Sequence, residues 1–68
     1  MIKIEDLTKK DIGKWVVYKT GHGTQERGRI KSWNNYFIFV VYKCDGNWDR
    51  FKDYTGCATE QKDLFWEL

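Results

Sequence analysis

The run Tyr36-Phe37-Ile38-Phe39-Val40-Val41-Tyr42 is the strongest indication of the fold, because it is the only long apolar stretch and contains no charge, glycine or proline. Its β-branched and aromatic residues are typical of a strand, and it is too short to cross a membrane. We expect it to form the central strand of a small β domain. Both faces of such a strand are apolar, so each needs cover from the chain or from a partner.

The length and charge of the chain limit what it can be. Its 68 residues have room for one domain, spanning residues 1–68, with a core that is marginal at this size. Four Trp, four Tyr and four Phe residues compensate, because each aromatic ring buries a large apolar area. The net charge of +2 is too small to indicate nucleic-acid binding by itself.

Shorter patterns on either side of the central run predict the other elements. Strands are expected at 15–18, 28–33 and 64–68, and the alternation of Ile2 and Ile4 suggests a short strand or an extended arm. Single helical turns are expected at 8–11 and at 59–63, the second capped by Thr59. These elements predict an all-β fold, a small, partly open barrel of about five strands with one or two short helical turns.

Residues 44–57 form a long excursion between two predicted elements. Trp48, Phe51 and Tyr54 recur in it at a spacing of three, which predicts either a helical turn or an ordered loop packed over the barrel. The segment also carries Asp45, Asp49 and Asp53, so it would place negative charge close to any basic face beside it.

Several short motifs spread over most of the chain form a recognisable set. They are Asp6-Leu7-Thr8, Asp11-Ile12-Gly13, Val16-Val17-Tyr18, Gly28-Arg29-Ile30-Lys31-Ser32-Trp33-Asn34, Phe37-Ile38-Phe39-Val40, Ala58-Thr59 and Asp63-Leu64-Phe65-Trp66. Together they resemble a family of small proteins encoded by bacteriophages and prophages. The resemblance implies an SH3-like barrel related in shape to Tudor and KOW modules, and an origin in the cytoplasm of a bacterial host. Most members of that family have no assigned biochemical role, so the resemblance implies no activity.

The alternation of side chains along 28–33 divides the predicted barrel into two faces. Ile30 should point into the core, which places Arg29, Lys31 and Trp33 together on the outer face. The core is expected to contain the larger apolar residues of the strands and the first turn. These are Ile12, Val16, Tyr18, Ile30, Ile38, Val40, Tyr42 and Leu64.

The neighbours of that outer face depend on the hairpin at Asn34-Asn35, because a shift of one residue reverses a strand. A two-residue loop would turn Tyr36, Ile38 and Val40 outward. A three-residue loop that includes Tyr36 would instead expose Phe37, Phe39 and Val41. We favour the longer loop, because the relatives that the chain resembles often carry a charged residue at the place of Val41.

The outer face is therefore the predicted binding site, formed by Arg29, Lys31, Trp33, Phe37 and Phe39. Its apolar stripe could be covered by residues 44–57, bind another protein, or pair with a second copy in a homodimer. We favour a protein partner, from the host or the phage, which could also add a strand to an exposed sheet edge. The alternative is nucleic-acid binding, with Trp33 stacking on a base while Arg29 and Lys31 contact the backbone. An aromatic cage for a methylated cation is a further option.

Catalysis, a metal site and a cofactor are not expected. His22, the only histidine, lies between two glycines in a polar loop with no partner that would make it a general base. Cys44, Cys57 and His22 fall short of the four ligands of a structural zinc site. We expect both cysteines to be free thiols in a reducing cytoplasm, although a disulfide across the excursion is a second possibility.

Overall fold

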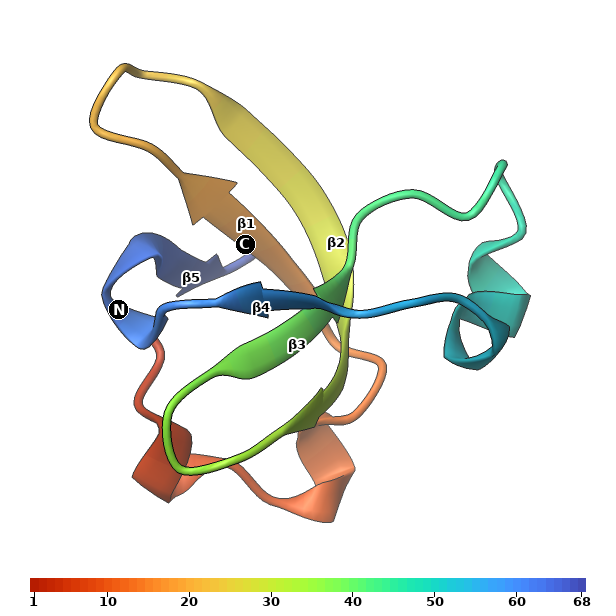
Figure 1. The fold of residues 1–68 in the computed structure, drawn as a ribbon, viewed down its shortest axis with the longest axis horizontal. Helices are drawn as coiled ribbons and strands as arrows, with labels where there is room; N and C mark the ends of the chain where they lie inside the picture. The colour runs from red at the N-terminus through yellow and green to blue at the C-terminus, as the bar shows by residue number, and fades with distance from the viewer.

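The computed structural model describes residues 1–68 as one antiparallel sheet with short 3-10 turns (Figure 1). The five strands lie in the order β4-β3-β2-β1-β5. Because β4 and β5 are the two edges and do not pair with each other, the sheet curls but does not close into a barrel. The strands are β1 (Trp15–Lys19), β2 (Gln25–Trp33), β3 (Ile38–Val41), β4 (Cys57–Thr59) and β5 (Leu64–Trp66).

Four short 3-10 segments accompany the strands. Two precede β1, namely η1 (Ile4–Asp6) and η2 (Lys9–Asp11), whereas η3 (Trp48–Asp53) lies between β3 and β4 and η4 (Gln61–Asp63) between β4 and β5. The helical turn predicted at 8–11 is confirmed, and the Asp11 carboxylate accepts a hydrogen bond from the Thr8 N–H at 2.9 Å. The turn predicted at 59–63 starts later than expected. Thr59 is not its cap but a buried residue of β4, a strand that the sequence did not reveal.

The main core lies on the inner face of the sheet, where six fully buried residues from four strands and the N-terminal arm meet. Tyr18 and Tyr42 pack against this cluster as half-buried rings. Ile12 is a correction to the predicted core, because it follows η2 at the surface and is 36% exposed. The six residues are Ile2, Val16, Ile30, Ile38, Val40 and Leu64.

Gly28 allows β2 to pass very close to β3. A Cβ atom at this position would lie 2.6 Å from Val40 Cγ1 and 2.7 Å from the Val41 carbonyl oxygen, both far inside van der Waals contact. Only a residue without a side chain fits there. Gly28 therefore permits the close approach of β2 to the end of β3.

The β2–β3 hairpin differs from both predicted registers. Trp33 pairs with Ile38, so four residues form the loop, and the Asn34 N–H donates to the Phe37 carbonyl oxygen at 3.0 Å. The Asn34 side chain also accepts hydrogen bonds from the Tyr36 and Phe37 N–H groups, each at 2.8 Å. Side-chain bonds of this kind stabilise a longer turn than the sequence pattern suggests.

A β-bulge between Ile30 and Ser32 breaks the strict alternation predicted for β2. Arg29 remains on the outer face, but beyond the bulge Trp33 turns inward and packs against the main core. The prediction that Arg29, Lys31 and Trp33 share one face is therefore wrong for Trp33. One unpaired residue in a strand reverses the orientation of every residue that follows it.

The excursion 44–57 covers the outer face beside β3, which confirms one of the predicted alternatives. Phe51 of η3 joins Cys44 and Val41 in a second buried cluster, flanked by Trp48 and Tyr54. Val41 was expected to be exposed, yet it is completely buried under this cover. In Figure 1 the excursion loops out at the right and returns into β4.

No helix in the structure combines the length and the apolar character that crossing a membrane requires.

Candidate functional site

Arg29, a predicted binding residue, is occupied by contacts within the chain. Its Nε donates to the Gly13 carbonyl oxygen at 2.7 Å, and its Nη1 donates to the Trp48 carbonyl oxygen at 2.6 Å. The guanidinium also lies 4.3 Å from the centre of the Phe51 ring. Arg29 therefore holds η3 against the sheet, and its charge is partly enclosed.

Lys31 and Phe39 are likewise used by the excursion. The Lys31 Nζ donates to the Tyr54 carbonyl oxygen at 2.6 Å. Phe39 is half-buried beneath Gly56, where an added Cβ atom would come within 2.9 Å of the Phe39 Cβ. With Trp33 on the inner face, the structure brings together only Arg29, Lys31 and Phe39 of the five predicted residues, and residues 44–57 cover them.

Trp15 and Arg27 occupy the part of the outer face that the excursion leaves partly uncovered. The Arg27 guanidinium lies 4.0 Å from the centre of the Trp15 ring and binds both carboxylate oxygens of Glu67. The side-chain hydrogen bond from Arg27 lowers the pKa of Glu67 below its usual value. Because the Arg27 charge is already paired with Glu67, this face offers less free positive charge than the sequence suggested.

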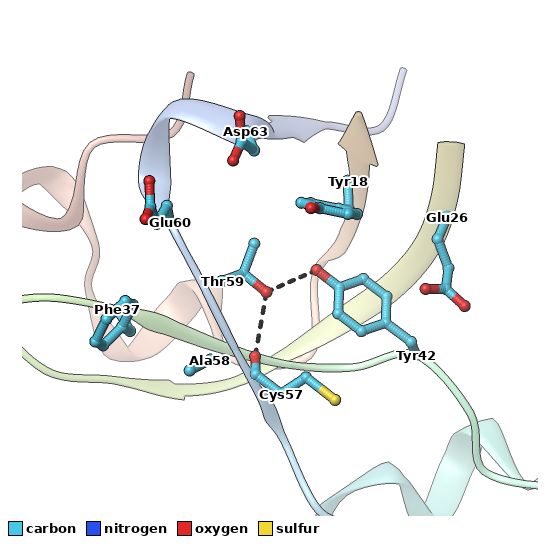
Figure 2. A pocket seen from close by; sticks show the side chains of 9 residues that line it. All are labelled: Tyr18, Glu26, Phe37, Tyr42, Cys57, Ala58, Thr59, Glu60 and Asp63. Carbon is cyan, nitrogen blue, oxygen red and sulfur yellow. Dashed lines mark hydrogen bonds between the residues drawn. The ribbon is translucent and has the colours of Figure 1, made fainter. Parts of the chain in front are cut away.

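The fifth predicted residue, Phe37, lies elsewhere and lines a pocket of about 430 Å³ at the open side of the sheet. Figure 2 shows this pocket between the β1–β2 hairpin on one side and β4 with η4 on the other. It is the space that remains because β4 and β5 do not close the barrel. The other lining residues are Tyr18, Glu26, Tyr42, Cys57, Ala58, Thr59, Glu60 and Asp63.

Two tyrosine rings form the apolar wall of the pocket. Tyr18 at the end of β1 and Tyr42 just after β3 lie with ring centres 6.1 Å apart, at an interplanar angle of 59°. Both rings rest on the main core, which fixes their orientation. A tilted pair at this separation is a favourable aromatic arrangement, so the two rings stabilise each other at the pocket wall.

The Tyr42 hydroxyl belongs to a short hydrogen-bond chain at the floor of the pocket (Figure 2). Thr59 Oγ1 donates to the Cys57 carbonyl oxygen at 3.1 Å, which uses its only hydrogen. The Tyr42 hydroxyl, 2.8 Å away, must therefore donate to Thr59 Oγ1. Burial raises the pKa of Tyr42 to about 12, the Thr59 hydrogen bond opposes this shift, and the Glu26 charge adds to it. The phenol is therefore neutral at physiological pH.

Three carboxylates surround these rings. Glu26 comes from β2, Glu60 from the residue before η4, and Asp63 from the end of η4. Glu60 forms an exposed ion pair with Lys62 at 3.3 Å, whereas Glu26 and Asp63 take part in no ion pair. No basic residue lines the pocket. Its chemistry is therefore that of an acidic, aromatic site, suited to a cationic group.

Sequence reasoning missed this pocket because its residues come from five separate segments. Tyr18 and Tyr42 were assigned to the core, and that prediction is confirmed in part, since both rings pack on it. The positions of Glu26 and Asp63 carried no motif. The one available signal was a tyrosine at each place where the apolar pattern stops, Tyr18 near the end of β1 and Tyr42 directly after β3.

A scan against protein-family models, a search of curated proteins and a search of solved structures each returned no match to this chain.

Proposed function

We propose that this chain is a non-enzymatic binding module for a protein partner, and that the acidic aromatic pocket receives a basic side chain of that partner. The single observation that carries the proposal is the grouping of Tyr18 and Tyr42 with three carboxylates around one cavity. This differs from the basic face expected from the sequence, because Arg29 and Lys31 are engaged within the chain.

The aromatic wall and the carboxylates favour the same ligand. A lysine ammonium or an arginine guanidinium within about 6 Å of an aromatic ring centre gains a cation–π interaction. Glu26 and Asp63 add an attraction that is free of competing ion pairs within the chain. An anionic ligand such as a nucleic-acid phosphate would be repelled at the same place, so the pocket favours protein over nucleic acid.

We further propose that the fold is an open variant of the SH3-like barrel. The strand order β4-β3-β2-β1-β5 and the 3-10 turn η4 directly before the last strand support this assignment. With the phage or prophage origin that the resemblance implies, the partner would be a host or phage protein met in the bacterial cytoplasm. Neither proposal depends on the other.

The test uses two synthetic, acetylated octapeptides as probes, one alternating valine with lysine and the other valine with glutamate. Backbone amide shifts of the full chain are followed by NMR during titration. The lysine peptide should shift the signals of Tyr18, Tyr42 and Asp63, whereas the glutamate peptide should not bind. The double variant Glu26→Gln, Asp63→Asn should weaken binding of the lysine peptide about tenfold, which corresponds to about 1.4 kcal/mol.

The matched control is the double variant Glu5→Gln, Asp49→Asn, which removes the same charge from exposed positions outside the pocket. It should bind the lysine peptide almost as tightly as the native chain does. Equal binding of both peptides, no binding of either peptide, or equal losses in the two double variants would overturn the proposed function. Comparing the two double variants separates the effect of the pocket from that of net charge, because each variant removes two negative charges.

A further inference from the structure

The two edges of the sheet differ in how their backbone groups are satisfied. At the β5 edge the N-terminal arm supplies a partner, because the Ile2 N–H donates to the Leu64 carbonyl oxygen at 2.8 Å. A side chain holds the same arm, since the Ile4 N–H donates to Gln61 Oε1 at 2.9 Å. No segment covers β4 in this way, so β4 is the open edge.

The hydrogen bonds of the β2–β3 hairpin show which way the backbone of β4 faces. Successive N–H and C=O pairs in a strand point alternately to its two sides. The Phe37 carbonyl oxygen accepts from Asn34, which is on the β2 side. By alternation, Ile38 and Val40 must face β4, and their partners there are Thr59 and Cys57.

The bonds between β2 and the segment before β1 lead to the same assignment. The Ile30 N–H donates to the Lys14 carbonyl oxygen at 3.1 Å, and the Ile30 carbonyl oxygen accepts from Gly13 at 2.7 Å. Arg29 therefore faces β3, where it pairs with Val41. Val41 must then face β2, and its neighbour Val40 faces β4, as the hairpin requires.

Ala58, between Cys57 and Thr59, therefore turns both its N–H and its C=O away from β3. The residue is exposed, and no turn, loop or side chain supplies a partner for either group. Ala58 also lines the pocket together with both of its neighbours. The open edge and the acidic aromatic pocket are thus parts of one surface.

We propose that the free edge of β4 receives an extended, basic segment of the protein partner as an added strand. The Ala58 N–H and C=O bind its backbone, and a basic side chain of the segment enters the pocket. Edge addition of this kind draws affinity from main-chain hydrogen bonds and specificity from pockets for alternate side chains. This inference rests on the proposed function, since the pocket selects the charge of the added strand.

The charge of the surface favours such a segment over a second copy of this chain. The β4 edge of a second copy would offer Cys57, Ala58 and Thr59, followed by Glu60, and so would bring a carboxylate instead of a cation. Glu26 and Asp63 would then gain no positive partner from that edge. Pairing of two β4 edges is therefore an outcome that contradicts the proposal.

The experiment replaces the hydrogen of the Ala58 N–H, the free donor of the β4 edge, with a methyl group. Residues 1–56, prepared as a thioester, are ligated to synthetic residues 57–68, because Cys57 provides the thiol that native chemical ligation requires. The ligated full chain carries either alanine or N-methylalanine at position 58. The added methyl group projects away from β3, so the internal sheet keeps its hydrogen bonds, and circular dichroism and thermal unfolding check that the fold is intact.

Binding of the alternating valine–lysine octapeptide should weaken at least about tenfold in the N-methyl chain relative to the unmodified ligated chain. Amide hydrogen exchange gives a second measurement that needs no variant. The Ala58 amide should exchange rapidly in the free native chain and at least about tenfold more slowly with the peptide bound. This measurement keeps the proposal testable even where the N-methyl chain folds poorly.

Equal affinity of the two ligated chains, or no change in Ala58 exchange when peptide binds, would overturn strand addition. A concentration-dependent dimer with a protected Ala58 amide and no peptide present would overturn it as well. These results differ from a failure of the proposed function. In that case the Glu26→Gln, Asp63→Asn chain would bind the lysine peptide as tightly as its control variant does.

Discussion

The Arg29 guanidinium and the Trp48 carbonyl oxygen lie 2.6 Å apart, and this hydrogen bond ties the excursion 44–57 to the sheet. The same side chain donates to the Gly13 carbonyl oxygen at 2.7 Å, so one residue links β2 both to η3 and to the turn before β1. A planar guanidinium can bind both oxygens at once because its donors point in fixed, divergent directions.

Replacing Arg29 with lysine should therefore destabilise the fold by about 2 kcal/mol, because a single ammonium group cannot reach both carbonyl oxygens. Urea unfolding of the two chains measures the loss. Amide exchange across η3 should accelerate more than exchange in β1. Arg50→Lys is the matched control in the same excursion, because the Arg50 side chain forms only an exposed ion pair with Asp53. This substitution should change the free energy of unfolding by less than about 0.5 kcal/mol. Equal losses in the two variants would contradict the assigned role of Arg29.

Gly28→Ala should destabilise the fold by about 2–3 kcal/mol, because the new methyl group would overlap Val40 and the Val41 carbonyl oxygen. Thermal and urea unfolding provide the measurement. Gly21→Ala is the control, because no atom lies within 4 Å of its added Cβ, and its effect should be within about 0.5 kcal/mol. A neutral Gly28→Ala would contradict the close approach of Gly28 to Val40 and Val41.

Stability should fall as the pH rises from 10 toward 12, through the titration of Tyr42. The folded chain raises the pKa of Tyr42 to about 12 from an unfolded value of 10.0, so the unfolded chain loses its proton first. The contribution is fully present below pH 10 and is lost progressively up to about pH 12. Because the ring is only half-buried, we expect a loss of about 1 kcal/mol. Unfolding in urea between pH 9 and 12 measures it, and Tyr42→Phe should reduce the slope. An identical slope in that variant would assign the loss to other groups.

The two cysteines should react with a thiol reagent at very different rates. Both are free, but Cys44 is 2% exposed within the second buried cluster, whereas Cys57 lies at the surface on β4. Cys57 should react at once, and Cys44 at least about a hundredfold more slowly, when the excursion opens. A coloured disulfide reagent follows both phases, and Cys57→Ser should leave only the slow one. Two fast phases would show that the excursion does not cover Cys44.

The excursion 44–57 is a segment whose main features could be predicted from the sequence pattern. The spacing of Trp48, Phe51 and Tyr54 predicted either a helical turn or an ordered loop packed over the barrel. The segment forms the 3-10 helix η3 and also packs over the outer face. Its entry turn has a local cause as well, because Asp45 and Gly46 both adopt positive φ angles and the Asn47 N–H donates to the Cys44 carbonyl oxygen at 2.8 Å. Short-range patterns of this kind are set by neighbours in the chain.

The register of the β2–β3 hairpin could not be predicted from the sequence pattern. A four-residue loop and a bulge at Lys31 both shift the register, and neither has a signature in the strictly alternating segment 28–33. Before the bulge the two register shifts cancel, so Ile30 still pairs with Val40, and Ile30, Ile38 and Val40 are buried as expected. Trp33 lies between the bulge and the loop, where the shifts do not cancel, and it therefore turns inward. The direction of a side chain beyond a bulge depends on pairing with another strand, which local alternation does not encode.

The amino-acid pattern alone was enough to predict a small antiparallel β protein, the positions of most of its strands, and an apolar run that needs cover on both faces. Those properties follow from apolar periodicity and from turn residues that act over a few positions. Three features emerged only from the folded chain. Arg29 and Lys31 anchor the excursion, Trp33 packs against the core, and two tyrosines and three carboxylates meet at an open edge. Such groupings join residues distant in the chain, and they depend on loop length, a bulge and the failure of two edges to meet, which no local pattern specifies.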